Sequence, residues 1–185
     1  MHSGQIHSAH YGINMTAKTD EPLTLMDFSD PDCILDWQPI NDGVMGGQSQ
    51  SVPQMVDGNL VFAGTISLAN NGGFASIRAR RQHHDLSDCD SVLLRVKGDG
   101  RTYQFRLYTD ACYQGKRIAY ATPFQTTNDT WVELRLYFSQ LQATFRGQKL
   151  SGPDFDSTSI AELGFMLVDK CAGPFQLHVE WIKVI

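Results

Sequence analysis

The spacing of short apolar runs and turn residues from Leu23 onward is the feature that most constrains how this chain can fold. Runs of β-branched, aromatic and aliphatic residues end at Gly, Pro, Asn or Asp, and no stretch keeps a helical period for more than about two turns. Alternation of apolar and polar residues is typical of strands with one buried face. We therefore predict an all-β chain of about nine or ten strands with little helix, folded as a two-sheet jelly-roll β-sandwich.

Two segments, 74–80 and 102–109, alternate most clearly. Each has one small or apolar face, which suits a packed interior, and one face with planar hydrogen-bonding groups. If the two strands share a sheet, their polar faces coincide, and guanidinium groups beside aromatic rings suit bidentate pairing with carboxylates. We predict that this face holds a partner through Phe74, Arg78, Gln104, Arg106 and Tyr108. In the alternative interpretation, Arg78 and Arg106 only pair with acidic residues such as Asp99 or Glu133.

The stretch 37–51 concentrates Asn, Asp and Gly residues between a tryptophan and a polar run. Glycine permits positive φ and close approach, and Asn and Asp bond to nearby backbone, so the stretch predicts a shaped loop. A second loop, 70–73, has the same chemistry. We expect the two loops to lie side by side and to offer Asn41, Asp42 and Asn71 to a ligand, with a purely structural turn as the alternative.

Four blocks in this order, N-D-G-V-M-G-G-Q-S, N-N-G-G-F-A-S-I-R, G-D-G-R-T-Y-Q-F-R-L and G-F-M-L-V-D-K-C-A-G-P-F, resemble the complex I intermediate-associated protein family. The resemblance covers roughly 24–185. It implies a galactose-binding-like β-sandwich. It also implies a chaperone-like assembly role in which a protein partner, such as a subunit of respiratory complex I (NADH:ubiquinone oxidoreductase), is bound.

The bulk composition limits the function classes further. A net charge of −5 argues against a general nucleic-acid binder, and the sequence has no apolar run of membrane-spanning length. Residues 1–22 lack the pattern of a signal or transit peptide, so we expect a flexible segment there, a single domain over 23–185 and a cytoplasmic location. Met15 is an alternative start. The four scattered cysteines are expected to be buried thiols.

Catalytic and cofactor motifs are not evident in the sequence. There is no G-x-S-x-G, and the glycine-rich loops do not follow strand-to-helix junctions, so we predict no enzymatic activity and no cofactor. Asp42 and Asp99 would permit acid/base chemistry only if they were neighbours. The histidines at 83 and 84 are expected to be solvated rather than metal-bound.

Two functions from different classes remain. The first is a non-enzymatic binding or assembly protein that holds a partner polypeptide. The second is a carbohydrate-binding module of galactose-binding-like type, which exposed tryptophans would favour. We expect Trp37, Trp131 and Trp181 to pack in the core, and this favours the protein partner.

Overall fold

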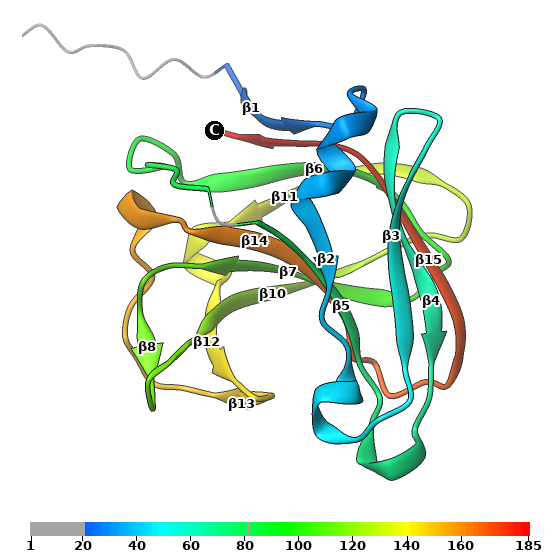
Figure 1. Ribbon diagram of the computed structural model, residues 1–185. Coiled ribbons are helices and arrows are strands. Elements are labelled where there is room, and N and C mark those ends of the chain that lie inside the picture. The colour runs from blue at the N-terminus through cyan, green and yellow to red at the C-terminus, as the bar shows by residue number, and fades with distance from the viewer. Residues whose placement is uncertain (1–20, 81) are drawn as a thin grey trace, which may run out of the picture.

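The computed structural model of the protein describes residues 21–80 and 82–185, and Figure 1 shows two layers of strands. Both main sheets are antiparallel. The all-β sandwich is therefore confirmed. Most of the predicted flexible segment lies outside the described residues, as does Met15.

The first sheet has the order β11-β6-β15-β4-β3, with β1 also paired to β15. Its strands are β1 (Leu23–Asp27), β3 (Gln50–Val56), β4 (Asn59–Ile66), β6 (Ser91–Lys97), β11 (Trp131–Tyr137) and β15 (Gly173–Val184).

The second sheet has the order β13-β12-β10-β7-β14-β5-β2. Its strands are β2 (Trp37–Pro39), β5 (Ala75–Ala79), β7 (Thr102–Tyr108), β10 (Ala119–Gln125), β12 (Gln142–Phe145), β13 (Gln148–Lys149) and β14 (Glu162–Leu167).

The remaining elements are short. Strands β8 (Cys112–Tyr113) and β9 (Lys116–Arg117) form a small hairpin. Five 3₁₀ helices occur in the described chain: η1 (Pro31–Asp36), η2 (Asp42–Met45), η3 (Ala69–Asn71), η4 (Phe138–Gln140) and η5 (Ser157–Ser159). The strands outnumber the nine or ten predicted, because pieces of two to four residues are too short to show alternation.

The core lies between the sheets and is built by the alternating residues. Ala75, Ile77 and Ala79 on β5 are buried, and the apolar residues of β7 are fully buried with them. Trp37 stacks on Phe165 at 6.1 Å between ring centroids. The faces predicted for the two strands are confirmed.

The Asp57-Gly58 turn joins β3 and β4 as predicted. Both residues have positive φ (49° and 73°), and Val56 pairs with Asn59 directly across the turn. This is the backbone of a two-residue primed hairpin, whose twist matches that of the flanking strands.

Two of the three tryptophans lie outside the core, contrary to the prediction. Trp131 and Trp181 are partly exposed on the outer face of the first sheet, where Lys97 lies 5.7 Å from the Trp131 ring and Lys183 lies 4.4 Å from the Trp181 ring. On β11, Val132, Leu134 and Leu136 face the core. Because successive side chains of a strand point to opposite faces, Trp131 points outward.

The cysteine prediction was also wrong in part. Cys33 and Cys89 are partly buried, whereas Cys112 and Cys171 are exposed, and all four are free thiols. Both exposed cysteines lie in or beside tight turns at the surface, away from the core between the sheets. None of the helices in 21–80 and 82–185 is long and apolar enough to cross a membrane.

Candidate functional site

The outer face of the second sheet brings together the arginines that the sequence singled out. Arg78 on β5 and Arg106 on β7 both pair with Gly164 of the intervening β14, one from each side. The glycine leaves space between the two guanidinium groups, and a Cβ there would lie 2.4 Å from the Ile77 carbonyl oxygen. The predicted coincidence of the polar faces is confirmed.

Arg78 belongs to a partly buried ion-pair cluster. Its Nη1 lies 3.1 Å from Glu162 Oε2, and Arg117 donates to the other oxygen of the same carboxylate. Glu162 was not foreseen as the partner, because it follows Arg78 by 84 positions in the sequence. The alternative interpretation of a structural polar layer therefore describes Arg78 well, with Glu162 in place of Asp99 or Glu133.

Arg106 has a different environment. Its guanidinium donates to the sulfur of Met166 and to Thr144 Oγ1 (3.1 Å), and its buried Nε has no hydrogen-bond partner. No carboxylate forms an ion pair with it in the part of the chain that the structure describes. A partly buried cation without an acidic partner is costly, so Arg106 carries a positive charge that no described carboxylate balances.

Among the other predicted residues of this face, Tyr108 contacts Arg78 directly. Tyr108 is 6% exposed, and its ring lies beneath the Arg78 guanidinium at 3.9 Å while its hydroxyl accepts from Arg78 Nη2. Gln104 is partly buried two residues before Arg106. Phe74 is partly buried and precedes β5. The ring of Tyr108 is thus covered by a cation and has no free face on that side.

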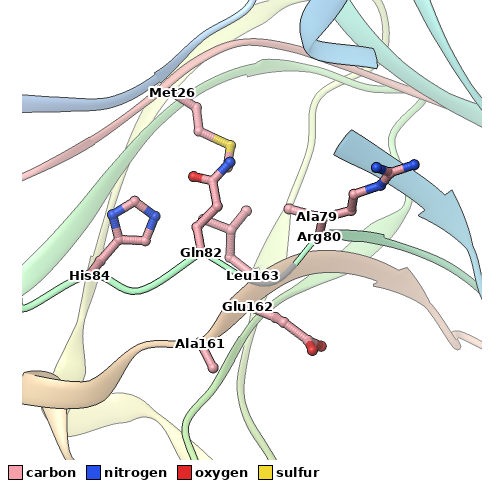
Figure 2. A pocket seen from close by; sticks show the side chains of 8 residues that line it. All are labelled: Met26, Ala79, Arg80, Gln82, His84, Ala161, Glu162 and Leu163. Carbon is pink, nitrogen blue, oxygen red and sulfur yellow. The ribbon is translucent and has the colours of Figure 1, made fainter. Parts of the chain in front are cut away.

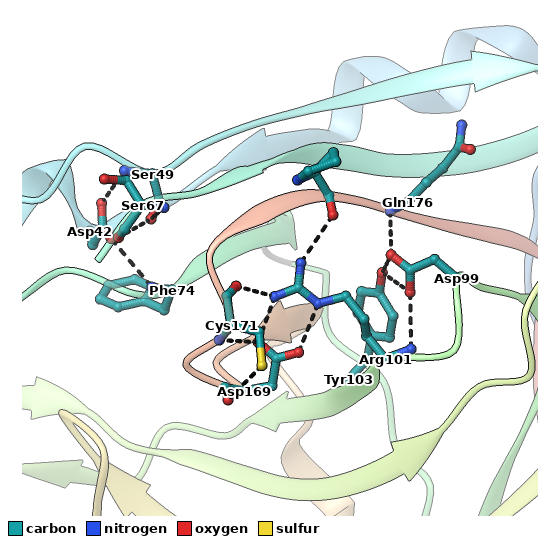
Figure 3. A network of polar contacts seen from close by, with 11 residues as sticks. Asp42, Ser49, Ser67, Phe74, Asp99, Arg101, Tyr103, Asp169, Cys171 and Gln176 are labelled. Atoms are coloured by element: carbon teal, nitrogen blue, oxygen red, sulfur yellow. Dashed lines mark hydrogen bonds and ion pairs between the residues drawn. The ribbon is translucent and has the colours of Figure 1, made fainter. Parts of the chain in front are cut away.

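The two loops rich in Asn and Gly lie side by side, as predicted, because one carboxylate joins them. Asp42 is 1% exposed, and it accepts hydrogen bonds from the backbone of Ser49 (2.8 Å) and Phe74 (3.3 Å) (Figure 3) and from the backbone of Gly73 (2.7 Å). Burial raises its pKa, but these hydrogen bonds outweigh burial and hold the pKa below the usual value. Asp42 therefore holds the loops together.

Asn41 and Asn71 have different surroundings. Asn41 Oδ1 accepts hydrogen bonds from Ser51 Oγ (2.6 Å) and from the backbone of Ser76 (3.3 Å), so it connects the loop to strands β3 and β5. Asn71 is exposed in η3 with a φ of 59°. The hydrogen bonds of Asn41 and Asp42 give both residues a structural role. A ligand-binding role for Asn41, Asp42 and Asn71 stays a prediction.

Gly46 ends η2 in the left-handed region (φ 87°), and a Cβ added to it would have no atom within 4 Å. Gly46→Val is expected to lower the free energy of unfolding by about 1 to 3 kcal/mol, because a β-branched residue is strained there. Urea denaturation measures the loss. Gly46→Asn is the matched control, because Asn tolerates this region better, and equal losses in both variants would contradict a backbone cause.

A shallow hollow beside the site offers no room for a ligand. It is lined by Met26, Gln82 and His84, among others, and has essentially no free volume (Figure 2). The carboxylate of Glu162 points away from Met26 and His84, toward the arginines. Burial, and then the neighbouring His83, lower the pKa of His84. Among the described residues, no group of three or more His, Cys, Asp or Glu could hold a metal ion.

The comparisons with known proteins decide the family. The model of the complex I intermediate-associated protein 30 family matches residues 26–179. This chain belongs to that family. Complex I intermediate-associated protein 30 of Mus musculus, a mitochondrial protein by its name, is 24% identical over 186 aligned residues. The match covers 89% of this chain but 56% of the mouse protein, so the chain spans about half the length of that relative.

Solved structures place this family member among galactose-binding-like jelly rolls. The family 11 carbohydrate-binding module of a Clostridium thermocellum cellulosomal cellulase, Lic26A-Cel5E, superposes with a TM-score of 0.70 at 17% identity, covering 89% of this chain and 94% of the module. A complex of that module with a mixed-linked β-1,3-1,4 tetrasaccharide gives 0.69 at 18% identity, with 89% and 95% covered. At these identities the likeness shows the fold, and the predicted fold is confirmed.

The family blocks G-D-G-R and V-D-K-C meet in a network that sequence reasoning missed (Figure 3). Arg101 donates through Nε and Nη2 to both oxygens of Asp169, at 2.7 and 2.6 Å. It also donates to the carbonyls of Pro174 (3.1 Å) and Cys171. The ion pair and its hydrogen bonds raise the pKa of Arg101 and lower that of Asp169. The sequence shows an arginine in one block and an aspartate in the other. It does not show that they pair, because 68 positions separate them.

Proposed function

We propose that this protein is a non-enzymatic binding protein that holds an acidic segment of a partner polypeptide on the outer face of the second sheet. The observation that carries this proposal is Arg106, a partly buried guanidinium with an unsatisfied Nε and no acidic partner among the described residues. A carboxylate from a partner would balance the charge of this partly exposed guanidinium, and charge-assisted bonds of this kind are stronger than neutral ones.

The neighbours of Arg106 support a polypeptide as the ligand. Gln104, partly buried two residues before Arg106, has an amide of the kind that binds peptide backbone. Arg78 and Arg117 share the carboxylate of Glu162, and Arg117 also lies 3.8 Å from Asp110, so the unbalanced positive charge of this face comes from Arg106. An anionic segment would be attracted to this face, although the whole chain is acidic.

A sugar on this same face is less well supported. Carbohydrate sites commonly use an aromatic ring as a platform, and the Tyr108 ring is covered by Arg78 at 3.9 Å. The structure of the similar module with its tetrasaccharide makes carbohydrate the other outcome to test. The carboxylates of Asp42 and Asp99 are each held by hydrogen bonds within the fold, which supports a protein without acid/base chemistry.

The family supplies the class of partner. The mouse relative is named for its association with complex I intermediates, and we extend to this chain an assembly role with a respiratory-complex subunit. The mouse protein is mitochondrial by name, whereas a cytoplasmic location for this chain stays a prediction.

Arg106→Gln is expected to reduce recovery of the partner at least tenfold, because it removes the charge and leaves a shorter, uncharged polar side chain. The measurement is quantitative co-purification from the host, with intact-mass identification and a subsequent affinity titration of the identified subunit. Arg135→Gln, on the opposite sheet, is the matched control and is expected to bind normally.

Three results would count against the proposal. Unchanged partner affinity in Arg106→Gln would contradict it, and so would an identified partner segment without acidic residues. Binding of the mixed-linked tetrasaccharide that Arg106→Gln abolishes would assign this face to carbohydrate instead.

A further inference from the structure

A pocket of about 270 Å³ lies away from the proposed partner face, at one end of the first sheet. Three segments meet there: the end of β6, the loop between β10 and β11, and the part of β15 around Gln176 and His178. Its polar lining comes from these three places: Lys97, Asp99, Asn128, Asp129, Gln176 and His178. Pockets of this size approach the volume that small-molecule sites occupy.

The floor of the pocket is held by hydrogen bonds that do not need a ligand. Asp99 accepts from the Tyr103 hydroxyl, from the backbone of Arg101 and from the backbone of Gln176, at 3.0 to 3.1 Å (Figure 3). The backbone of Asp129 donates to the Gly98 carbonyl at 2.9 Å. Its φ of 50° places a non-glycine residue in the left-handed region, a conformation that surrounding structure must stabilise.

The walls of the pocket offer uncharged hydrogen-bonding groups. The side chains of Asn128, Gln176 and His178 make no hydrogen bond within the described chain, and Figure 3 shows the Gln176 amide directed away from Asp99. Partial burial, and then the Lys97 ammonium, lower the pKa of His178, so its imidazole is neutral near pH 7 and offers one donor and one acceptor.

The charges of the pocket are largely balanced internally. Lys97 lies 3.1 Å from Asp129, and Asp99 is occupied by its donors. A charged ligand would have to compete with these contacts. A neutral ligand rich in hydroxyl groups would find free amides and a neutral imidazole.

An aromatic ring borders these polar groups. Trp131 follows the pocket loop directly, and its ring lies 6.4 Å from the His178 ring and 5.7 Å from Lys97 Nζ. The Trp131 ring is partly exposed. Arg95 and Lys97 lie 5.5 and 5.7 Å from its centroid, so they cover it less closely than Arg78 covers Tyr108 at 3.9 Å. Apolar faces of sugar rings pack on such rings while their hydroxyls bond to amides.

We propose that this pocket, with Trp131 at its edge, is a binding site for a neutral sugar ring. The site is independent of the partner face, which lies on the other sheet. Of the residues that line it, Gly98 and Asp99 belong to a family block and the other five do not.

The test is a titration of the full chain with glucose, galactose, mannose, xylose and the mixed-linked β-1,3-1,4 tetrasaccharide, followed by tryptophan fluorescence and by backbone amide shifts. At least one probe is expected to shift the amides of 97–99, 128–131 and 176–178. Trp131→Ala and Asn128→Ala are each expected to weaken that probe at least tenfold. Trp181→Ala is the matched control, because Trp181 is also partly exposed on this face but its ring lies against Lys183, which does not line the pocket.

The outcomes separate the two sites. No shift in these segments with any of the five probes would overturn the proposal, and so would normal binding by Asn128→Ala and Trp131→Ala together. Arg106→Gln must leave the sugar titration unchanged, since a loss there would place the sugar on the partner face. Asn128 is exposed, so its variant tests the site even if Trp131→Ala fails to fold.

Discussion

Asp169→Ala is expected to lower the free energy of unfolding by about 3 kcal/mol or more, because it leaves the Arg101 guanidinium largely buried without its counter-ion. The two side chains are 14% and 16% exposed, so solvent screens the pair only slightly. Asp169 Oδ1 also accepts from the backbone of Cys171 at 3.0 Å, and this bond is lost as well. Urea denaturation with a comparison of midpoints measures the effect.

A double-mutant cycle separates the ion pair from the local turn. Asp169→Ala in an Arg101→Ala background is expected to cost about 1 to 3 kcal/mol less than in the wild type, because no unpaired charge remains. Glu133→Ala is the matched control. Glu133 pairs with Arg95 at 3.1 Å but is 62% exposed, so its loss is expected to stay within about 1 kcal/mol. Equal losses in Asp169→Ala and Glu133→Ala would show that burial does not strengthen the Arg101 pair.

The sequence predicted the sandwich and its two clearest strands because alternation is a local property. The inward residues of β5 and β7 could be assigned from spacing alone, and both assignments are confirmed. Trp131 shows the opposite case. Its neighbours Val132 and Leu134 pack against the core, so the alternation of side chains along β11 places Trp131 on the outer face.

The partners within the candidate site could not be predicted, because they come from distant parts of the chain. Glu162 follows Arg78 by 84 positions, and Asp169 follows Arg101 by 68. Spacing within a strand indicates which way a side chain points, but only the order of strands in the sheet shows what it meets. The insertion of β14 between β5 and β7 brings Glu162 to Arg78, whereas Arg106 forms no ion pair with a carboxylate among the described residues.

Asp42→Ala is expected to cost about 3 to 5 kcal/mol of the free energy of unfolding, because three backbone N–H groups in the paired loops lose their acceptor. Asp42→Asn is expected to cost nearly as much. Its amide has the same shape, but its NH₂ group would face an N–H donor of Ser49 or Gly73. If Asn restored wild-type stability in urea denaturation, the role of Asp42 would be steric rather than that of a charged acceptor.

Acid should remove the contribution of Asp42. Its pKa is lower in the folded protein than in the unfolded chain, so its stabilisation is complete well above the unfolded value of about 3.9 and is lost as the pH falls through the folded value. The difference in unfolding free energy between wild type and Asp42→Asn should therefore shrink below about pH 4. Asp154→Asn is the matched control, because Asp154 is exposed, and it should stay within about 0.5 kcal/mol of wild type. A difference between wild type and Asp42→Asn that stays constant as the carboxylate is protonated would mean that its charge does not hold the two loops together.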